Sequence, residues 1–203
     1  TYWQANNSPE VRPFWDNAAY HTGNMEVYFL TGNEEQLEYT KHWAEHNKYY
    51  GATSENREEW VYHYGEHPQF VLFGDWQICF QVYIDLYNIE HRAERLERTL
   101  EVMCHQASMK EKDFWWWSDA LYMGLPIFTK LYKVTGDQKL LDKQYECFVW
   151  TDSLLFDTED FLYYRDAKYI YPKVKTACNG GKSFWARGDG WVLAGLAKVL
   201  QDL

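Results

Sequence analysis

The sequence predicts an all-α fold built from helical hairpins, and two observations carry that prediction. Apolar residues recur with the period of an α-helix along most of the chain. A short pattern also occurs twice, at 27–33 and 131–137: an apolar stretch, then Thr-Gly, then Asn or Asp. Gly32 and Gly136 suit the left-handed residue that ends a helix, and the polar residue after each suits the N-cap of the next helix. Each copy therefore predicts two helices joined by a tight turn.

The remaining elements follow from the same periodicity. A third copy, over 86–96, keeps the apolar frame but lacks the glycine. In chain order we expect helices over 15–30, 34–49, 76–88, 91–107, 119–134, 138–152 and 188–202. The long connections, over 50–75, 108–118 and 153–187, fall between hairpins, which would put them on one side of a circular array. Long loops in compact domains are usually functional, so that side is the expected site. Hairpins in series can form a solenoid, a bundle or a closed toroid, and periodicity alone does not choose among them.

Composition limits the classes of partner. With 203 residues, 46% of them hydrophobic, we expect a single domain over 1–203. A net charge of -10 argues against nucleic acid or an anionic membrane as the partner. The aromatic content of 19% favours a saccharide, because flat apolar rings pack against sugar rings. The chain opens with Thr1 and not with a charged-then-apolar leader, so this sequence shows no signal peptide. The compartment, the cytoplasm or periplasm of a bacterium, stays open, as does the oligomeric state.

No metal or cofactor is expected. The four cysteines show no CxxC spacing and read as buried free thiols: Cys79, Cys104, Cys147 and Cys178. His42 and His46 form an i, i+4 pair, but no third metal ligand accompanies them. Phosphate-binding glycine loops and the nucleophile elbow of serine hydrolases are missing from the sequence, which argues against nucleotide cofactors and serine hydrolysis.

Three segments carry a resemblance to a known family. FGDWQ at 73–77, WSDALYM at 117–123 and FWARGDGW at 184–191 resemble the active-site stretches of glycoside hydrolase families 88 and 105, the unsaturated glucuronyl and rhamnogalacturonyl hydrolases. The similarity extends to WDNA at 15–18 and to both Thr-Gly turns. It implies an (α/α)6 toroid of helical hairpins, of which this chain is an incomplete N-terminal portion. The lone helix expected from Gly188, without a partner helix, agrees with a fragment of a longer chain.

The resemblance also implies roles for individual residues. Asp119 would be the general acid and base, and Asp75 a second essential carboxylate. The substrate would contact Trp15, Asn17, Trp76, Trp117, Met123, Trp185, Arg187 and Trp191. The chain departs from the family pattern at 163–166, where some relatives have a histidine, and at Asp189, where Asn or Gln is usual.

The implied reaction is a hydration that releases a 4,5-unsaturated uronic acid from the non-reducing end of an oligosaccharide, with pectin-type rhamnogalacturonan favoured. A single carboxyl group that donates a proton to C4 and accepts one from water needs a raised pKa. Burial against the tryptophans at 115–117 and the charge of Asp75 would raise the pKa of Asp119, whereas a helix N-terminus would lower it. Arg187 suits the uronate carboxylate, because a guanidinium offers two parallel donors. Arg165 is a weaker candidate for a second anionic group.

Structural alternatives stand beside these roles. Both aspartates could be helix N-caps, Arg187 could form a salt bridge with a neighbouring aspartate, and single tryptophans could simply pack between helices. Two other functions also stay open. One is an α/α-toroid glycosidase of the inverting type, with two carboxyl groups flanking a water. The other is a non-catalytic, carbohydrate-binding helical module.

Overall fold

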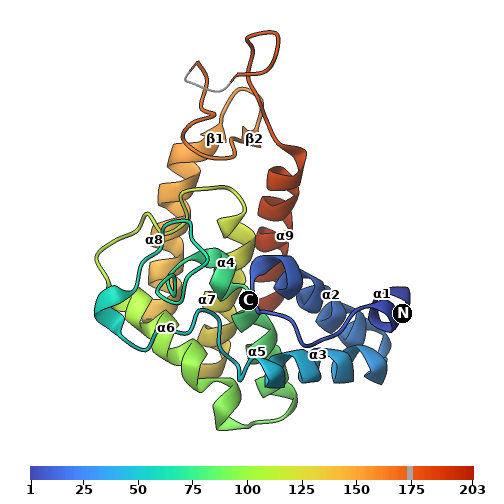
Figure 1. Cartoon of the computed structure of the whole chain (residues 1–203). Helices are drawn as coiled ribbons and strands as arrows, with labels where there is room; N and C mark the ends of the chain where they lie inside the picture. Colours follow the sequence, from blue (N-terminus) through green and yellow to red (C-terminus); the bar gives the residue numbers. More distant parts are fainter. Residues whose placement is uncertain (173–175) are drawn as a thin grey trace. The chain divides into compact units, whose positions relative to one another are not determined.

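A computed structural model describes residues 1–172 and 176–203, and most of this chain is helical (Figure 1). The all-α prediction is therefore confirmed, apart from one small β-hairpin. The chain divides into two compact units, Thr1–Gln106 and Ala107–Leu203. The single-domain organisation stays a prediction. Within the described ranges, every helix is too short or too polar to cross a membrane.

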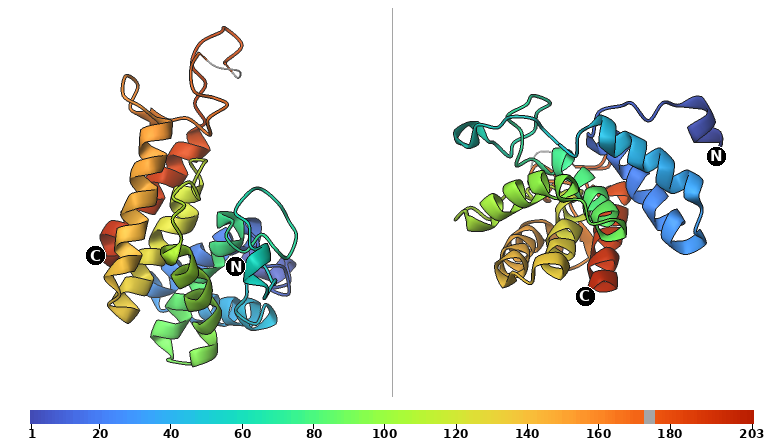
Figure 2. Two further views of the ribbon diagram at one scale, coloured as in Figure 1. Left: turned by 90° about the vertical axis from the view of Figure 1, so that its left-hand side faces the viewer. Right: turned by 90° about the horizontal axis from the view of Figure 1, so that it is seen from below.

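The first unit contains the hairpin of α2 and α3. Its elements are α1 (Tyr2–Asn6), α2 (Trp15–Thr31), α3 (Glu34–His46), η1 (Arg57–Glu59), α4 (Gly74–Gln77), α5 (Cys79–Ile89), η2 (Ala93–Arg95) and the greater part of α6 (Glu97–Ser108). Helix α2 packs against both α3 and α5 (Figure 2). The predicted turn is confirmed: Gly32 has φ 66°, and its N–H donates to the Tyr28 carbonyl at 2.7 Å. The Asn33 side chain then accepts from the Glu35 N–H and caps α3.

A buried histidine lies in the core of this hairpin. The ring of His21 stacks on Trp43 with centroids 4.1 Å apart and on Tyr39 with centroids 5.6 Å apart. Its Nδ1 lies 3.2 Å from the Thr40 hydroxyl. Burial lowers the pKa of His21 to about 3, so the ring is neutral at ordinary pH.

The third hairpin ends its first helix without a glycine. A helix was predicted over 91–107, but α6 begins only at Glu97, because Glu90 adopts an extended conformation and η2 intervenes. Arg95, with 1% of its surface exposed, donates from Nη1 to the carbonyls of Leu86 (2.8 Å) and Glu90 (3.3 Å). The Glu90 N–H also donates to the Leu86 carbonyl at 3.1 Å, so the buried guanidinium adds to the backbone hydrogen bond at the end of α5.

The second unit is organised around a central helix. It contains α7 (Ala120–Thr135), α8 (Gln138–Leu155), β1 (Phe156–Asp157), β2 (Leu162–Tyr163) and α9 (Ala186–Asp202). Helix α7 packs against α8 and α9 (Figures 1 and 2), and its residues 120–131 are all buried. At Gly195 a Cβ would lie 2.5 Å from the Leu121 carbonyl oxygen, so glycine permits the close approach of α9 to α7. Gly136, with φ 71°, ends α7 as predicted.

Two local predictions need correction. The connection over 153–187 contains a two-stranded antiparallel hairpin in which Phe156 pairs with Tyr163. Cys79 and Cys147 are buried as expected, but Cys104 and Cys178 are exposed. Cys104 falls off the buried stripe of α6, and Cys178 lies in the long connection before α9.

Candidate active site

The predicted acid, Asp119, stands immediately before α7. It is the N-cap residue of that helix, but its backbone is already α-helical and its side chain makes no capping hydrogen bond. The capping alternative for Asp119 is therefore wrong. The Ser118 hydroxyl donates to Asp119 Oδ1 at 3.3 Å.

The environment of Asp119 favours its protonated form. Burial is the largest influence and raises the pKa of the carboxyl group, although the Ser118 hydrogen bond and the charges of Arg165 and Arg187 act in the opposite direction. The raised pKa is the direction that a proton donor needs.

Backbone contacts fix the segment that carries Asp119. The Ser118 N–H donates to the Arg165 carbonyl at 2.9 Å, and Trp117 forms an isolated antiparallel bridge with Asp166. A Cβ on Gly188 would lie 2.6 Å from the Ser118 hydroxyl oxygen, so this glycine allows α9 to begin directly against Ser118. Segments around 118, 165 and 188 thus converge on the acid.

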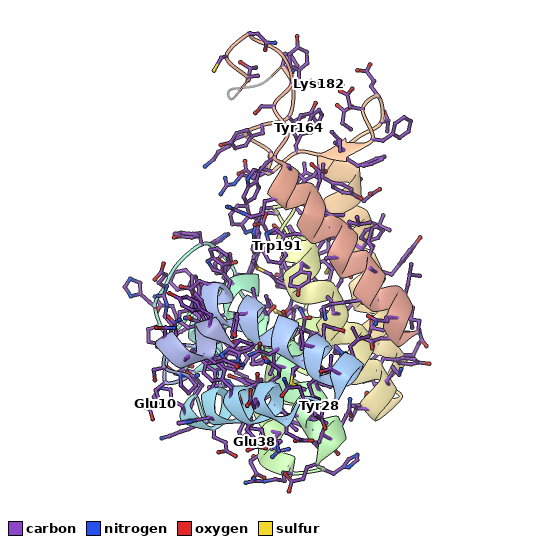
Figure 3. The ribbon with its side chains drawn as sticks, turned by 90° about the vertical axis from the view of Figure 1, so that its right-hand side faces the viewer. Glu10, Tyr28, Glu38, Tyr164, Lys182 and Trp191 are labelled. Atoms are coloured by element: carbon purple, nitrogen blue, oxygen red, sulfur yellow. The ribbon has the colours of Figure 1, made fainter. Side chains whose placement is uncertain are left out.

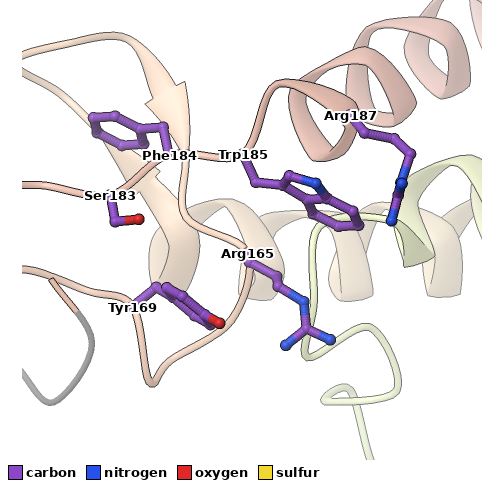
Figure 4. A pocket seen from close by; sticks show the side chains of 6 residues that line it. All are labelled: Arg165, Tyr169, Ser183, Phe184, Trp185 and Arg187. Atoms are coloured by element: carbon purple, nitrogen blue, oxygen red, sulfur yellow. The ribbon is translucent and has the colours of Figure 1, made fainter. Parts of the chain in front are cut away.

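A pocket of about 340 Å³ lies beside these segments (Figure 4). Its lining is cationic and aromatic: Arg165, Tyr169, Ser183, Phe184, Trp185 and Arg187. The guanidinium carbon of Arg187 lies 4.3 Å from the centroid of the Trp185 ring, and that of Arg165 lies 5.9 Å from it. Such a lining suits a sugar ring that carries a carboxylate.

The two arginines differ in their protein partners. Arg165 Nη1 donates to Asp166 Oδ2 at 2.7 Å, and Asp166 is only 3% exposed. For Arg187 the salt-bridge alternative is wrong, because this exposed guanidinium reaches no carboxylate at ion-pair distance within residues 1–172 and 176–203. The Arg187 guanidinium lies instead over the Trp185 ring, and its contact with substrate stays a prediction.

The other predicted residues of the second unit are more deeply packed. Trp117 is buried against Trp116, with ring centroids 4.6 Å apart. Trp191, labelled in Figure 3, packs on Tyr122 at 4.6 Å, and Met123 is 2% exposed. Of the three predicted tryptophans in this unit, Trp185 lines the pocket. Substrate contacts by Trp117, Met123 and Trp191 stay predictions.

The candidates in the first unit occupy two helix starts. Asp75 is 6% exposed and is the second residue of α4, which Phe73 precedes as N-cap, so Asp75 does not cap that helix. Trp76 is buried, and its Nε1–H donates to the Gly65 carbonyl at 3.1 Å. Trp15 and Asn17 lie half-buried in the first turn of α2. The roles of these four residues stay predictions.

Sequence reasoning missed three of the pocket residues. Tyr169, Ser183 and Phe184 lie in the long connection between α8 and α9 and line the pocket with the arginines. The aromatic density of that connection was a usable signal for Tyr169 and Phe184, whereas Ser183 carried none.

Helical hairpins beside a pocket lined by arginine and aromatic side chains are the arrangement expected of a helical carbohydrate-active protein. The family model described as Glycosyl Hydrolase Family 88 matches residues 1–203, and the chain belongs to this family. This membership confirms the resemblance drawn from the sequence.

Relatives with printed functions are similar to parts of the chain. Two proteins named unsaturated 3S-rhamnoglycuronyl hydrolase, from Formosa agariphila and Alteromonas sp. (strain LOR), are 37% and 36% identical to it over 92 and 89 residues. Each alignment covers 44% of this chain, but only 24% and 21% of the respective relative.

Solved structures match the whole chain. A glycosyl hydrolase family 88 protein from Bacteroides vulgatus superposes with a TM-score of 0.97 at 51% identity, and a structure described as a polysaccharide lyase with 0.96 at 58% identity. A family 105 glycoside hydrolase from C. acetobutylicum ATCC 824 shares the fold at 20% identity, with a TM-score of 0.71. These matches confirm the predicted fold class, the helical hairpins of an α/α toroid. The chain spans 58%, 57% and 56% of the three structures.

Proposed function

We propose that the protein containing this chain is a hydrolase that removes a 4,5-unsaturated uronic acid from the non-reducing end of an oligosaccharide. The observation that carries the proposal is the half-buried Asp119, whose pKa is raised by burial, next to a pocket with two guanidinium groups. Membership of family 88 and the similarity to two unsaturated rhamnoglycuronyl hydrolases support it.

Asp119 would act as both acid and base. Its carboxylic acid donates a proton to C4 of the enol-ether double bond, and positive charge develops at C5 beside the ring oxygen. A water that loses a proton to the resulting carboxylate adds at C5. The C5 hemiketal then opens to a ketone, and the hemiacetal at C1 releases the linked sugar as an alcohol. The proton returned by the water restores Asp119 for the next turnover.

Arg187 and Trp185 would bind the uronate. A carboxylate accepts two parallel hydrogen bonds from a guanidinium, and the indole already holds the Arg187 guanidinium at 4.3 Å from its ring centroid. For the linked sugar we propose rhamnose, which fits both the rhamnogalacturonan preference from the sequence and the names of the two relatives. The carboxylate of Asp75 would assist from α4, a role that rests on the resemblance alone.

The test is turnover of lyase-generated disaccharides by the complete protein. A hydratase-type hydrolase destroys the double bond, so ultraviolet absorbance falls and a reducing sugar appears. Arg187→Lys keeps the charge but loses the two parallel N–H donors of the guanidinium, and we expect it to weaken uronate binding by roughly 1–3 kcal/mol. Equal Michaelis constants for wild type and Arg187→Lys would remove Arg187 from the carboxylate site. A panel with and without rhamnose tests the linked sugar.

A lyase is a second candidate, and the similarity to a structure described as a polysaccharide lyase at 58% identity favours it. In β-elimination a base removes the C5 proton, the C4–oxygen bond breaks, and the departing oxygen takes up a proton. Arginines that neutralise the carboxylate make C5 more acidic, and the phenol of Tyr169 lies in the same pocket. The same spectrophotometric assay separates the candidates, because a lyase acting on a saturated substrate raises the absorbance that the hydrolase lowers.

A further inference from the structure

The segment 182–185 is tethered to the β1–β2 hairpin on both sides of its pocket-lining residues. Ser183, Phe184 and Trp185 form one wall of the pocket and belong to neither helix nor strand. Lys182 precedes them, and Asp189, in the first turn of α9, follows them. Neither tether residue lines the pocket itself.

Lys182 provides the first tether. Its ammonium group lies 2.9 Å from Asp157, 2.7 Å from Glu159 and 3.0 Å from Asp160, all in or next to the turn of the β-hairpin. Figure 3 shows Lys182 and Tyr164 at the same end of the unit, beyond the start of α9. The hydrogen bonds to Glu159 and Asp157 raise the pKa of Lys182, as a tightly held cation requires.

The carboxylate of Asp157 links this tether to the pocket wall. The Tyr164 hydroxyl donates to Asp157 Oδ2 at 2.6 Å, while Lys182 binds the same carboxylate. The ring of Tyr164 stacks on Phe184, with centroids 4.8 Å apart and planes at 28°. One carboxylate therefore orders both the lysine at the start of the segment and the aromatic ring behind Phe184.

Asp189 provides the second tether. Its Oδ1 accepts a hydrogen bond from the backbone N–H of Tyr163 at 2.8 Å. That N–H belongs to β2, so the carboxylate joins the first turn of α9 to the strand. The contact needs an acceptor oxygen at this position but no charge, because the side-chain amide of asparagine also has an acceptor oxygen.

From these contacts we infer that Lys182 and Asp189 are positioning residues for substrate binding: together they hold Phe184 and Trp185 as a preformed wall of the arginine pocket. The inference rests on the proposed function to the extent that this pocket binds the sugar. An irregular segment that must be ordered on binding costs affinity, whereas a preordered one does not. Loss of a tether should therefore raise KM and leave the proton-transfer step at Asp119 nearly unchanged.

The first experiment replaces the lysine in the complete protein. We expect Lys182→Met to raise KM for the unsaturated disaccharide about tenfold with kcat within about twofold, and Lys182→Arg to restore most of the affinity. The control is Lys143→Met, because Lys143 also binds a carboxylate, that of Glu146, and the carbonyls of Met109 and Glu111, but none of these contacts involves the β1–β2 hairpin or the segment 182–185. The control should lower the melting temperature without changing KM.

The second experiment uses a matched pair at Asp189. Asp189→Asn keeps an oxygen that can accept from Tyr163 N–H and should leave KM within about twofold, while Asp189→Leu removes the acceptor and should raise KM about tenfold. Equal KM values for the two variants, or a kcat loss that matches the KM change, would overturn the positioning role of Asp189.

Hydrogen exchange separates this inference from the proposed function, because it needs no substrate. Faster exchange of the Tyr163 and Tyr164 amides in Lys182→Met and Asp189→Leu, with α7 unchanged, is expected. Wild-type exchange in both variants would overturn the tether even in an active enzyme. If the wild-type protein shows no turnover but the Tyr163 and Tyr164 amides still exchange faster in both variants, the proposed reaction is rejected and the tether is supported.

Discussion

Replacing Asp119 separates proton transfer from packing, because its side chain has no part in capping α7. Asparagine nearly matches aspartate in shape and can still accept from the Ser118 hydroxyl. It cannot deliver the proton that C4 requires. We therefore expect Asp119→Asn to lower kcat by roughly a hundredfold or more, with substrate binding largely retained.

The stability of a second variant, Asp119→Ala, distinguishes the acid from a cap. Loss of a true N-cap costs about 1 kcal/mol. Since no capping hydrogen bond exists here, we expect a change within about 0.5 kcal/mol at neutral pH. The sign follows from the pKa: burial raises it in the folded state, so the wild type loses stability as the pH rises through the folded pKa of Asp119. The alanine variant lacks that loss, so at pH values above the folded pKa of Asp119 it should gain unfolding free energy relative to wild type.

Two measurements decide the question. Loss of double-bond absorbance in the complete protein gives kcat, and urea unfolding at several pH values gives the free energy of unfolding. Substantial turnover by Asp119→Asn, together with a clear loss of stability in Asp119→Ala, would show that the aspartate is structural. The search for the acid would then move to Asp75.

Three further outcomes concern stability and the support of the site. The pKa of His21 is about 6.5 in the unfolded chain and about 3 in the folded one, so between these pH values the unfolded chain binds more protons. The contribution of His21 to the free energy of unfolding is therefore complete above about pH 6.5 and falls by up to about 1.4 kcal/mol per pH unit below it. His21→Phe should remove that slope in urea unfolding at pH 7 and pH 5, and an unchanged slope would contradict the buried neutral ring. The methyl group in Gly188→Ala should displace Ser118, so we expect a lower kcat with little change in the melting temperature. A lower melting temperature with unchanged kcat would show that the contact does not influence Asp119. Arg95→Met should cost about 2 kcal/mol in unfolding free energy, because it removes the two hydrogen bonds that Nη1 donates to the Leu86 and Glu90 carbonyls; a loss below about 0.5 kcal/mol would mean that water replaces them.

Two of the three hairpins could be predicted from the sequence because their signals are local. Gly32 and Gly136 adopt the left-handed conformation, and the Asn33 and Asp137 side chains cap the next helix as the pattern requires. In the third hairpin the second helix was predicted to begin at 91, but it begins at Glu97, because α5 ends at an extended Glu90 and not at a left-handed glycine. Arg95 adds hydrogen bonds to the Leu86 and Glu90 carbonyls there, and no local sequence pattern reveals that this arginine is buried.

The candidate site was predicted unevenly for the same reason. Asp119, Trp185 and Arg187 lie in recognisable motifs, and the structure gives Asp119 a raised pKa and the other two a common pocket. The wall of that pocket depends on pairs far apart in sequence. Lys182 meets Asp157 across 25 residues, and Asp189 meets Tyr163 across 26.

The departure at Asp189 shows how such a pair changes the interpretation of a motif. In the sequence an aspartate where Asn or Gln is usual suggests an altered substrate contact. In the structure its Oδ1 accepts from the Tyr163 backbone N–H, a bond that the amide oxygen of Asn could also accept. The departure at 163–166 is different in kind, because Arg165 lines the pocket and Asp166 fixes its guanidinium. Differences in substrate between this chain and its relatives should therefore be sought at Arg165 before Asp189.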